Sequence, residues 1–257
     1  MTVNNFPIKN LASKPIFGLE VSKSAARKVQ IAEGTCRDSS NRLDIGVGSS
    51  FEDLQGHTVS APLTVDAAVT GVNGLDAGSI AASTVYAVYV IADSHGYKTT
   101  AGLLSLASNS SPTLPADYNA FRLVGYAVTD GSSNFLDMVQ VGAGNARKLL
   151  LDSPQSLVSA QSNTSYAAVD ASAFVPPVEN SIAWIRAVLK GNAAGDTLNL
   201  KKNGSTGDFF EIEAQVATGS ADLKALAMVP VDSSANVAAK VSAGSYDLLA
   251  VGFEFNV

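Results

Sequence analysis

Cysteine and histidine are scarce in this sequence: Cys36 is the only cysteine among 257 residues, and His57 and His95 are the only histidines. One cysteine excludes an intrachain disulfide and a cysteine metal cluster, so the chain is not a disulfide-stabilised secreted scaffold, and we expect Cys36 to be a small buried residue. His57 has no histidine or glutamate at metal-ligand spacing, and no loop has the Asp-x-Asp-x-Asp-Gly pattern of calcium sites. The sequence therefore predicts neither a metal nor a cofactor.

Charged residues and long apolar runs are also scarce. Only 16% of the residues are charged, with 17 basic and 23 acidic side chains and a net charge of −6. The basic residues are scattered apart from three adjacent pairs, so the clustered positive surface that binds nucleic acid is missing. No run approaches the roughly 18 apolar residues of a membrane span, and the first residues lack an apolar stretch of signal-peptide length. We therefore expect no nucleic-acid partner, no membrane partner and synthesis in a cytoplasm, and the low charge density favours assembly with other subunits.

The residue types used in catalysis occur in unfavourable arrangements. Asp93, Ser94 and His95 are the three residue types of a hydrolase triad. A triad draws them from separate elements, so this adjacent set, closed by Gly96, predicts a turn. Residues 142–145 (GAGN) begin like a dinucleotide-binding loop but lack its third glycine and a following helix, which indicates a linker.

Carboxylates are the only plentiful functional groups. A glycosidase needs two of them about 5–10 Å apart in a cleft, whereas we expect these carboxylates in solvated turns or on an outer strand face. The candidates are Asp44, Asp66, Asp76, Asp93, Asp130, Glu211 and Glu213. The sequence thus predicts no catalytic residue and a protein that is not an enzyme.

Aromatic residues are concentrated between residues 86 and 126, and they have two interpretations. They could form a platform on which sugars stack, but at strand positions core packing or subunit contact is the commoner use, and we favour it. The residues are Tyr86, Tyr89, Tyr97, Tyr118, Phe121 and Tyr126.

Short apolar runs separated by turn residues dominate the rest of the chain and predict an all-β fold. In the first half we expect strands at residues 29–32, 43–47, 85–92, 103–107, 121–129 and 135–141. In the second half we expect them at 182–189, 197–201, 208–216, 223–229, 236–241 and 246–257. Asn203-Gly204 predicts a hairpin with a type I′ turn. Only residues 50–54 and 74–83 are expected to form short helical turns.

Two tandem β domains account for this pattern. Residues 27–145 are expected to form a β-sandwich or meander, 146–160 a linker within the Gly/Ala/Ser-rich segment 142–162, and 161–257 a jelly-roll-like sandwich. Residues 1–26 are too irregular for a helix or a strand, which predicts an extended arm that lies on another surface, with a disordered tail as the alternative. The candidate assembly contacts in this arm are Phe6, Ile8, Leu11, Ile16 and Phe17.

A series of motifs in residues 16–140 resembles the opening of tailed-bacteriophage virion proteins. In order they are IFGLE (16–20), VQIAEG (29–34), CRDSSNRLDI (36–45), GLDAGS (74–79), the Tyr-rich strand 84–93, PTLPADY (112–118), FRLVGY (121–126) and TDG (129–131). Their order and spacing are more specific than any single motif. Cys36 replaces the usual Ala, and Ala116-Asp117 replaces the usual Ser-Gly or Gly. Residues 169–177 (VDASAFVPP) and 202–205 (KNGS) are similar to later parts of such proteins.

The resemblance implies a virion structural component, a homotrimer in its usual state, that contacts other virion proteins. Tail fibre, baseplate or neck accessory, and capsid-surface fibre or decoration subunit are the positions left open, with the arm as the anchor. The alternative is a receptor-binding module that recognises host surface polysaccharide through exposed aromatic and polar residues. A polysaccharide-cleaving enzyme is the third interpretation and the least favoured.

Overall fold

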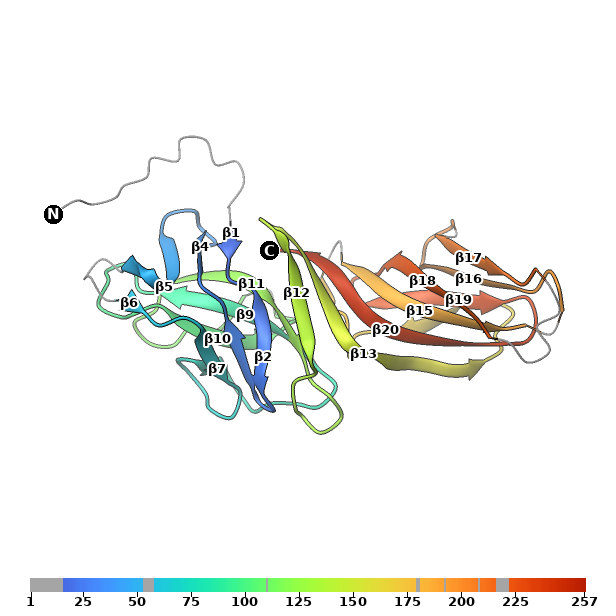
Figure 1. Ribbon diagram of the computed structural model, residues 1–257, viewed down its shortest axis with the longest axis horizontal. Coiled ribbons are helices and arrows are strands. Elements are labelled where there is room, and N and C mark those ends of the chain that lie inside the picture. The colour runs from blue at the N-terminus through green and yellow to red at the C-terminus, as the bar shows by residue number, and fades with distance from the viewer. Residues whose placement is uncertain are drawn as a thin grey trace.

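The computed structural model describes residues 16–52, 58–109, 111–178, 181–191, 193–207, 209–215 and 222–257. In these residues the chain forms twenty β-strands and no helix (Figure 1). The described residues therefore contain no candidate membrane-spanning helix. The all-β prediction is confirmed.

Twelve strands precede residue 146. They are β1 (Ile16–Gly18), β2 (Val21–Ala25), β3 (Lys28–Ile31), β4 (Gly34–Arg37), β5 (Asp44–Glu52), β6 (Thr58–Val59), β7 (Leu63–Asp66), β8 (Gly74–Leu75), β9 (Val85–Ala92), β10 (Ala101–Leu106), β11 (Ala120–Val128) and β12 (Met138–Ala143). Eight strands follow: β13 (Ala146–Gln161), β14 (Ala167–Asp170), β15 (Ile182–Lys190), β16 (Thr197–Lys202), β17 (Phe210–Glu213), β18 (Leu223–Pro230), β19 (Asn236–Val241) and β20 (Ser245–Asn256).

One eight-stranded sheet runs through both halves of the molecule, in the order β18-β15-β20-β13-β12-β2-β3-β7 (Figure 1). Two four-stranded sheets, β11-β9-β10-β8 and β14-β19-β16-β17, contact its N-terminal and C-terminal parts respectively. The last sheet, β1-β4-β5-β6, lies in the N-terminal half. The architecture is therefore two sandwiches built on one shared sheet.

The register of the eight-stranded sheet aligns one residue from every strand. Directly paired residues lie on the same face of a sheet. The row of paired residues is Thr64, Gln30, Ser22, Val139, Leu150, Gly252, Trp184 and Met228, from β7 to β18. We call the face that carries this row the outer face.

The neighbouring residues in these strands point to the opposite, inner face, and they are buried. They are Leu63, Ile31, Val21, Gln140, Leu149, Phe253, Ala183 and Val229. The single polar member, Gln140, donates a hydrogen bond from Nε2 to the Val124 carbonyl oxygen at 3.0 Å. This strict alternation with a period of two gives each sandwich its core.

The segment predicted as a linker, residues 146–160, is the strand β13, which pairs with β12 and β20. The GAGN segment is a tight hairpin, because Ala143 pairs with Ala146 and Gly144 has a φ of 60°. Both linker predictions are therefore wrong. The composition of residues 146–160 is typical of a loop, but pairing with β20, about a hundred residues further along the chain, holds this segment as a strand. The division into two domains stays a prediction.

Three local predictions also need correction. Residues 50–52 belong to β5, and residues 74–83 form β8 and turns, so the described parts of the two helical-turn predictions are not helical. Residues 16–26 of the predicted arm contain β1 and β2. At Asn203-Gly204 the turn is present, closed by Ser205 N to Lys202 O at 3.0 Å, but only Gly204 has a positive φ, so it is not type I′.

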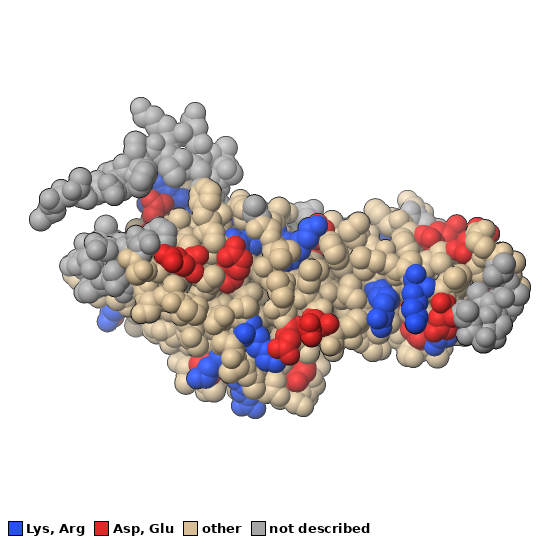
Figure 2. Space-filling model, in the orientation of Figure 1, with Lys and Arg blue, Asp and Glu red and all other residues tan. Residues whose placement is uncertain are grey.

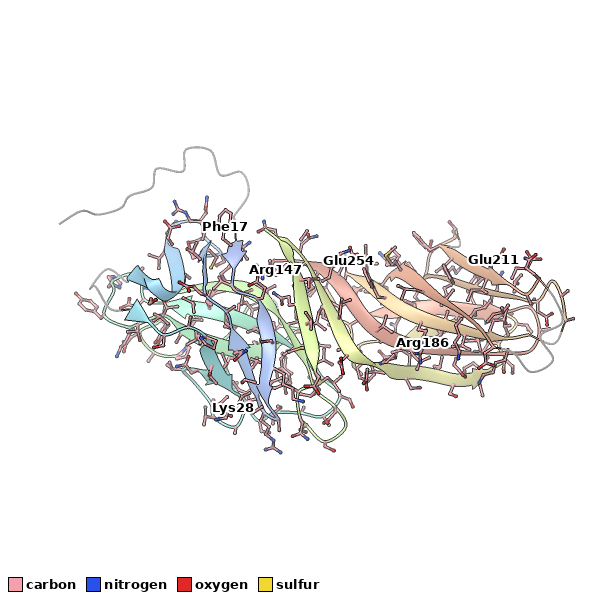
Figure 3. All side chains as sticks on the ribbon, in the orientation of Figure 1. Phe17, Lys28, Arg147, Arg186, Glu211 and Glu254 are labelled. Atoms are coloured by element: carbon pink, nitrogen blue, oxygen red, sulfur yellow. The ribbon has the colours of Figure 1, made fainter. Side chains whose placement is uncertain are left out.

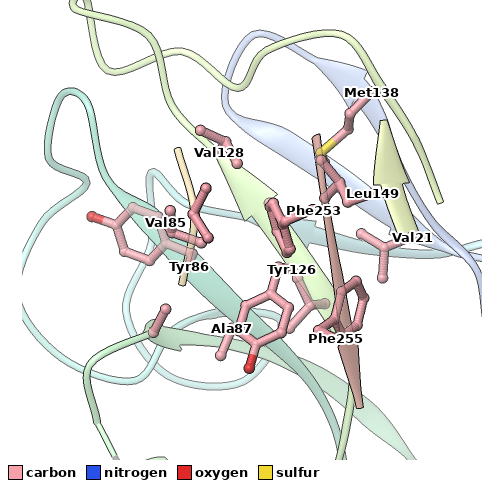
Figure 4. Packing of buried hydrophobic residues seen from close by; sticks show 14 of the residues in the cluster. Val21, Val85, Tyr86, Ala87, Tyr126, Val128, Met138, Leu149, Phe253 and Phe255 are labelled. Carbon is pink, nitrogen blue, oxygen red and sulfur yellow. The ribbon is translucent and has the colours of Figure 1, made fainter. Parts of the chain in front are cut away.

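Aromatic packing joins the two halves. The Tyr126 ring on β11 makes edge contacts with Phe255 and Phe253 on β20, at centroid distances of 4.8 and 5.8 Å (Figure 4). The end of the last strand is thus part of the N-terminal core.

Two buried arginines complete the junction. Arg147 donates hydrogen bonds to the carbonyl oxygens of Gly18 at 2.7 Å and Leu19 at 3.3 Å. Arg122 donates to the Val257 carbonyl oxygen at 2.7 Å. Burial lowers the pKa of both guanidinium groups, but arginine stays protonated in proteins. Each guanidinium group therefore forms hydrogen bonds to a segment that lies more than a hundred residues away in the sequence.

Replacing Arg147 should destabilise the fold, because Arg147→Met leaves the carbonyl groups of Gly18 and buried Leu19 without their charged donor. We expect the free energy of unfolding to fall by roughly 2–4 kcal/mol, measured by urea denaturation. The control is Arg27→Met, at an exposed turn position, which should change stability by less than about 0.5 kcal/mol. Equal effects from the two variants would contradict a junction role for Arg147.

Candidate interaction surface

The five predicted assembly contacts do not form one set. Phe6, Ile8 and Leu11 lie outside the described residues. Ile16 is buried in the core of its own chain, so it is not available to a partner. Phe17 is 62% exposed and lies at the edge of the N-terminal half (Figure 3). Of the described members of the set, only Phe17 fits a contact with another molecule.

The Asp93 loop is a turn, as predicted. The backbone amide of His95 donates to Asp93 Oδ1 at 2.9 Å and that of Tyr97 to Oδ2 at 2.9 Å; with these bonds the pKa of the Asp93 carboxyl is lowered. The Ser94 amide donates to Asn119 Oδ1, and Asn119 Nδ2 donates to the Ser94 hydroxyl, each at 2.8 Å. The loop therefore uses its polar groups to hold its own shape.

The other candidate carboxylates are dispersed in the same way. Asp130 accepts the amides of Ser132 and Asn134, and the Asn134 amide is the main cause of its lowered pKa. Asp66 pairs with Lys28 at 2.9 Å and Asp44 with Arg37 at 2.9 Å. Among the described residues, no group of three or more metal-ligating side chains converges. Burial raises the pKa of the Cys36 thiol to about 12, so it is not a reactive thiolate.

Most of the predicted aromatic residues pack internally. Tyr86, Tyr89 and Tyr126 are buried, and Phe121 makes an edge contact with Tyr89 at 5.8 Å. Tyr97 is exposed and stacks on His95. The preference for packing over a sugar platform is confirmed for the buried three.

The outer face of the eight-stranded sheet carries the most coherent exposed apolar surface. Val139 is 58% exposed, Met228 57% and Leu226 52%. In the row of paired residues, half-buried Leu150 and Trp184 lie between Val139 and Met228. An antiparallel sheet with one solvated face normally alternates apolar with polar residues, so these exposed apolar side chains, which lie beside Arg186 and Lys224, form a candidate contact surface.

A charged cluster sits inside this apolar surface. Glu254 accepts a hydrogen bond from Trp184 Nε1 at 3.2 Å and pairs with Lys148 at 3.0 Å. The Lys148 ammonium also lies 4.8 Å from the centroid of the Trp184 ring. Beside the cluster is a cavity of about 110 Å³, lined by Lys148, Ile182, Glu254 and neighbouring residues. Ligand pockets are usually about 300–1,000 Å³, so this cavity is too small for one.

A second cluster lies on β14-β19-β16-β17. The ammonium groups of Lys201 and Lys240 lie 3.9 and 4.6 Å from the centroid of the Tyr166 ring. Asn199 pairs with Lys240 across the strands, and its amide donates to Glu211. Within the described part of the chain neither lysine has a carboxylate ion pair. The result is an aromatic ring with positive and amide groups on one sheet surface.

Sequence reasoning did not find Trp184, Met228, Val139 or Tyr166. In the runs 182–189 and 223–229, which are predicted as strands, Arg186 and Lys224 share a face with Trp184 and Met228, so the period of two indicates that this face points outward. The pairing of β15 with β18 places Arg186 opposite Leu226 on the same face.

No family model matches this chain, and no curated protein matches it. Among solved structures, the chain is similar to a carbohydrate-binding module of lichenase 5A from Cellvibrio mixtus, in complex with cellotriose. The two are 15% identical, and the match covers 48% of this chain and 86% of that chain, with a TM-score of 0.21. At this identity and TM-score the likeness carries no argument about ligands.

Proposed function

We propose that this chain is a non-enzymatic structural subunit of a tailed-bacteriophage virion, at a fibre, baseplate, neck or capsid-surface position. The observation that carries the proposal is the ordered set of motifs in residues 16–140. The proposal places the protein in the virion after its synthesis in the bacterial host, with other virion proteins as its partners.

The motifs of this resemblance occupy framework positions of the first sandwich. In IFGLE, Gly18 has a φ of 66°, and a Cβ there would lie 2.2 Å from the Glu33 carbonyl oxygen, so the site needs glycine. The following Leu19 is fully buried. In FRLVGY, Arg122 is the buried arginine that holds Val257. The motifs thus specify the sandwich and its junction, which suits a structural protein.

The polar groups support the same function. Asp93 and Asp130 are engaged in their own turns, Asp44 and Asp66 are in ion pairs, and the cavity on the outer face is small. Charged side chains form separate small groups on the face seen in Figure 2, with broad uncharged surface between them. Such a surface is suited to contact with protein neighbours.

The experiment is mass spectrometry of density-purified phage particles, with the gene intact or with codons 2–15 deleted. We expect the intact protein in particles at a fixed copy number. The deletion spares β1 and the buried Leu19, so the variant should keep its circular dichroism spectrum, and we expect it to be lost from particles because residues 1–15 supply the anchor. The matched control, Tyr97→Ala, changes an exposed side chain and should be incorporated normally.

Absence of the intact protein from particles would contradict the virion proposal. Normal incorporation of the deletion variant would contradict only the anchoring role of the arm.

A second candidate function is recognition of a host surface polysaccharide, favoured by the Tyr166 cluster. Sugar sites combine an aromatic face with amide and charged groups. Here Lys201 and Lys240 flank Tyr166, and Asn199 and Glu211 lie beside them on the same sheet. The pair of ammonium groups favours a saccharide that carries carboxylates.

Binding to an array of bacterial surface glycans tests this candidate. Tyr166→Ala should reduce binding about five- to tenfold, because loss of an aromatic stacking contact is worth on the order of 1–1.5 kcal/mol. Tyr97→Ala, an exposed tyrosine in the other half, is the control and should bind as the unmodified protein does. Absence of glycan binding, or binding unchanged by Tyr166→Ala, would exclude this site.

A further inference from the structure

Two of the strands at sheet edges are long, and they differ in how their edges are covered. β11 has nine residues and β18 has eight, whereas every other described edge strand has four or fewer. The edge of β11 is covered from within the chain, because the amides of Ser39 and Leu136 donate to the carbonyl oxygens of Phe121 and Val128, each at 2.8 Å. Within the described residues, β18 pairs with β15 alone.

The register shows which backbone groups of β18 point to its free edge. The Val231 amide donates to the Ser181 carbonyl oxygen at 3.2 Å, and the pairing of β15 with β18 continues this register without a shift. In an antiparallel pair, residues that bond to the neighbouring strand alternate with residues whose N–H and C=O groups point away from it. The N–H and C=O groups of Lys224, Leu226 and Met228 therefore point away from β15, and they have no hydrogen-bond partner in the described part of the chain.

The same three residues carry exposed side chains on the outer face. Arg186 on β15 lies directly opposite Leu226, and its Nε is buried without a hydrogen-bond partner among the described residues. A strand that paired with β18 would place its own outer-face side chains opposite Lys224, Leu226 and Met228. This edge therefore offers both unpaired backbone groups and a row of side chains to an added strand.

The charge beside this edge is positive. Two carboxylates act on Lys190: Asp247, which pairs with it at 2.6 Å, and Asp222, which precedes β18. Neither Arg186 nor Lys224 has an ion pair within the described ranges. Three cationic groups thus face two carboxylates, and an acidic side chain on an added strand would meet an unpaired cation.

We propose that β18 binds an extended segment of another protein, which joins the eight-stranded sheet as an antiparallel strand. The segment carries an acidic side chain opposite Lys224 and apolar side chains opposite Leu226 and Met228. Main-chain hydrogen bonds supply the affinity and alternate side chains the specificity. Pro230 has no N–H, so the added ladder ends beside Met228. The inference rests on the geometry of this edge and does not depend on the virion function.

Amide hydrogen exchange, followed by NMR, tests whether the edge is free. In the isolated chain the amides of Leu226 and Met228 should exchange on the order of a hundredfold faster than those of Ala225 and Ala227, which bond to β15. Protection of Leu226 and Met228 in the isolated chain would overturn the proposal. If that protection grows with protein concentration, the occupant is a second copy of this chain.

A synthetic peptide tests the chemistry of the partner. In antiparallel register, the peptide TVTVTET places its glutamate opposite Lys224 and its two valines opposite Leu226 and Met228. Added to the full-length chain, it should shift the amide resonances of β18 with a dissociation constant below about 1 mM. The peptide TVTVTKT should bind about two- to fivefold more weakly, the effect of one exposed ion pair, and Lys224→Glu should reverse this preference.

Backbone methylation distinguishes an added strand from contact through side chains alone. N-methylation of both valines blocks N–H groups that point at β18 and should abolish binding. N-methylation of the third and fifth residues, threonines whose N–H groups point away from β18, should change the affinity by less than about threefold.

A variant of the edge gives the matching result on the protein side. Leu226→Pro removes an N–H that does not bond to β15, so it should weaken binding of TVTVTET about fivefold. Leu226→Val is the matched control, because it keeps the N–H and an apolar side chain, and it should bind as the unmodified chain does. Circular dichroism and urea midpoints show whether both variants are folded.

No binding of TVTVTET at about 1 mM, or equal losses from the two methylated peptides, would overturn this inference. The peptide experiments use the unmodified chain, so they decide the question even if Leu226→Pro does not fold. Particle composition reports separately on the virion function, since a chain that is absent from particles keeps or lacks the β18 site independently.

Discussion

Hydrogen-bonded register across eight strands is the constraint on which the rest of this structure depends. β13 pairs with β12 on one side and with β20 on the other, so the two halves share backbone hydrogen bonds. A single row of paired residues then reaches from β7 to β18, which fixes one buried and one outward face for both sandwiches. Because a shift of one residue would exchange the two faces, the buried inner row specifies the outer row as well.

The junction is reinforced by side chains whose partners are far away in sequence. Phe253 and Phe255 at the end of β20 pack on Tyr126, and Arg147 binds the carbonyl groups of the β1–β2 turn. The N-terminal core is therefore completed by the last strand of the chain. Together these contacts join the two sandwiches through side chains as well as through the shared sheet, which suits the proposed structural subunit.

Strand positions could be predicted from sequence, but their partners could not. The run 85–92 coincides with β9 because it is bounded by polar turns, and 236–241 coincides with β19. Ser153-Pro154 made residues 146–160 look like a linker. In β13 the pairing with β20 is irregular between Leu150 and Gln155, and because proline cannot donate a backbone hydrogen bond, this irregularity lets Pro154 lie within the strand. Arg186 and Lys224 mark the strand faces that carry Trp184 and Met228 as outward, but the alignment of these two residues in one row depends on pairing between distant segments.

The most direct test of a shared sheet is whether the two halves unfold together. Trp184 fluorescence reports on the C-terminal half, and amide hydrogen exchange in β9 reports on the N-terminal half; both can be followed through one urea titration. The shared sheet predicts a single transition with coincident midpoints for the two probes. Two separate transitions, with β9 protected after Trp184 has become exposed, would contradict it.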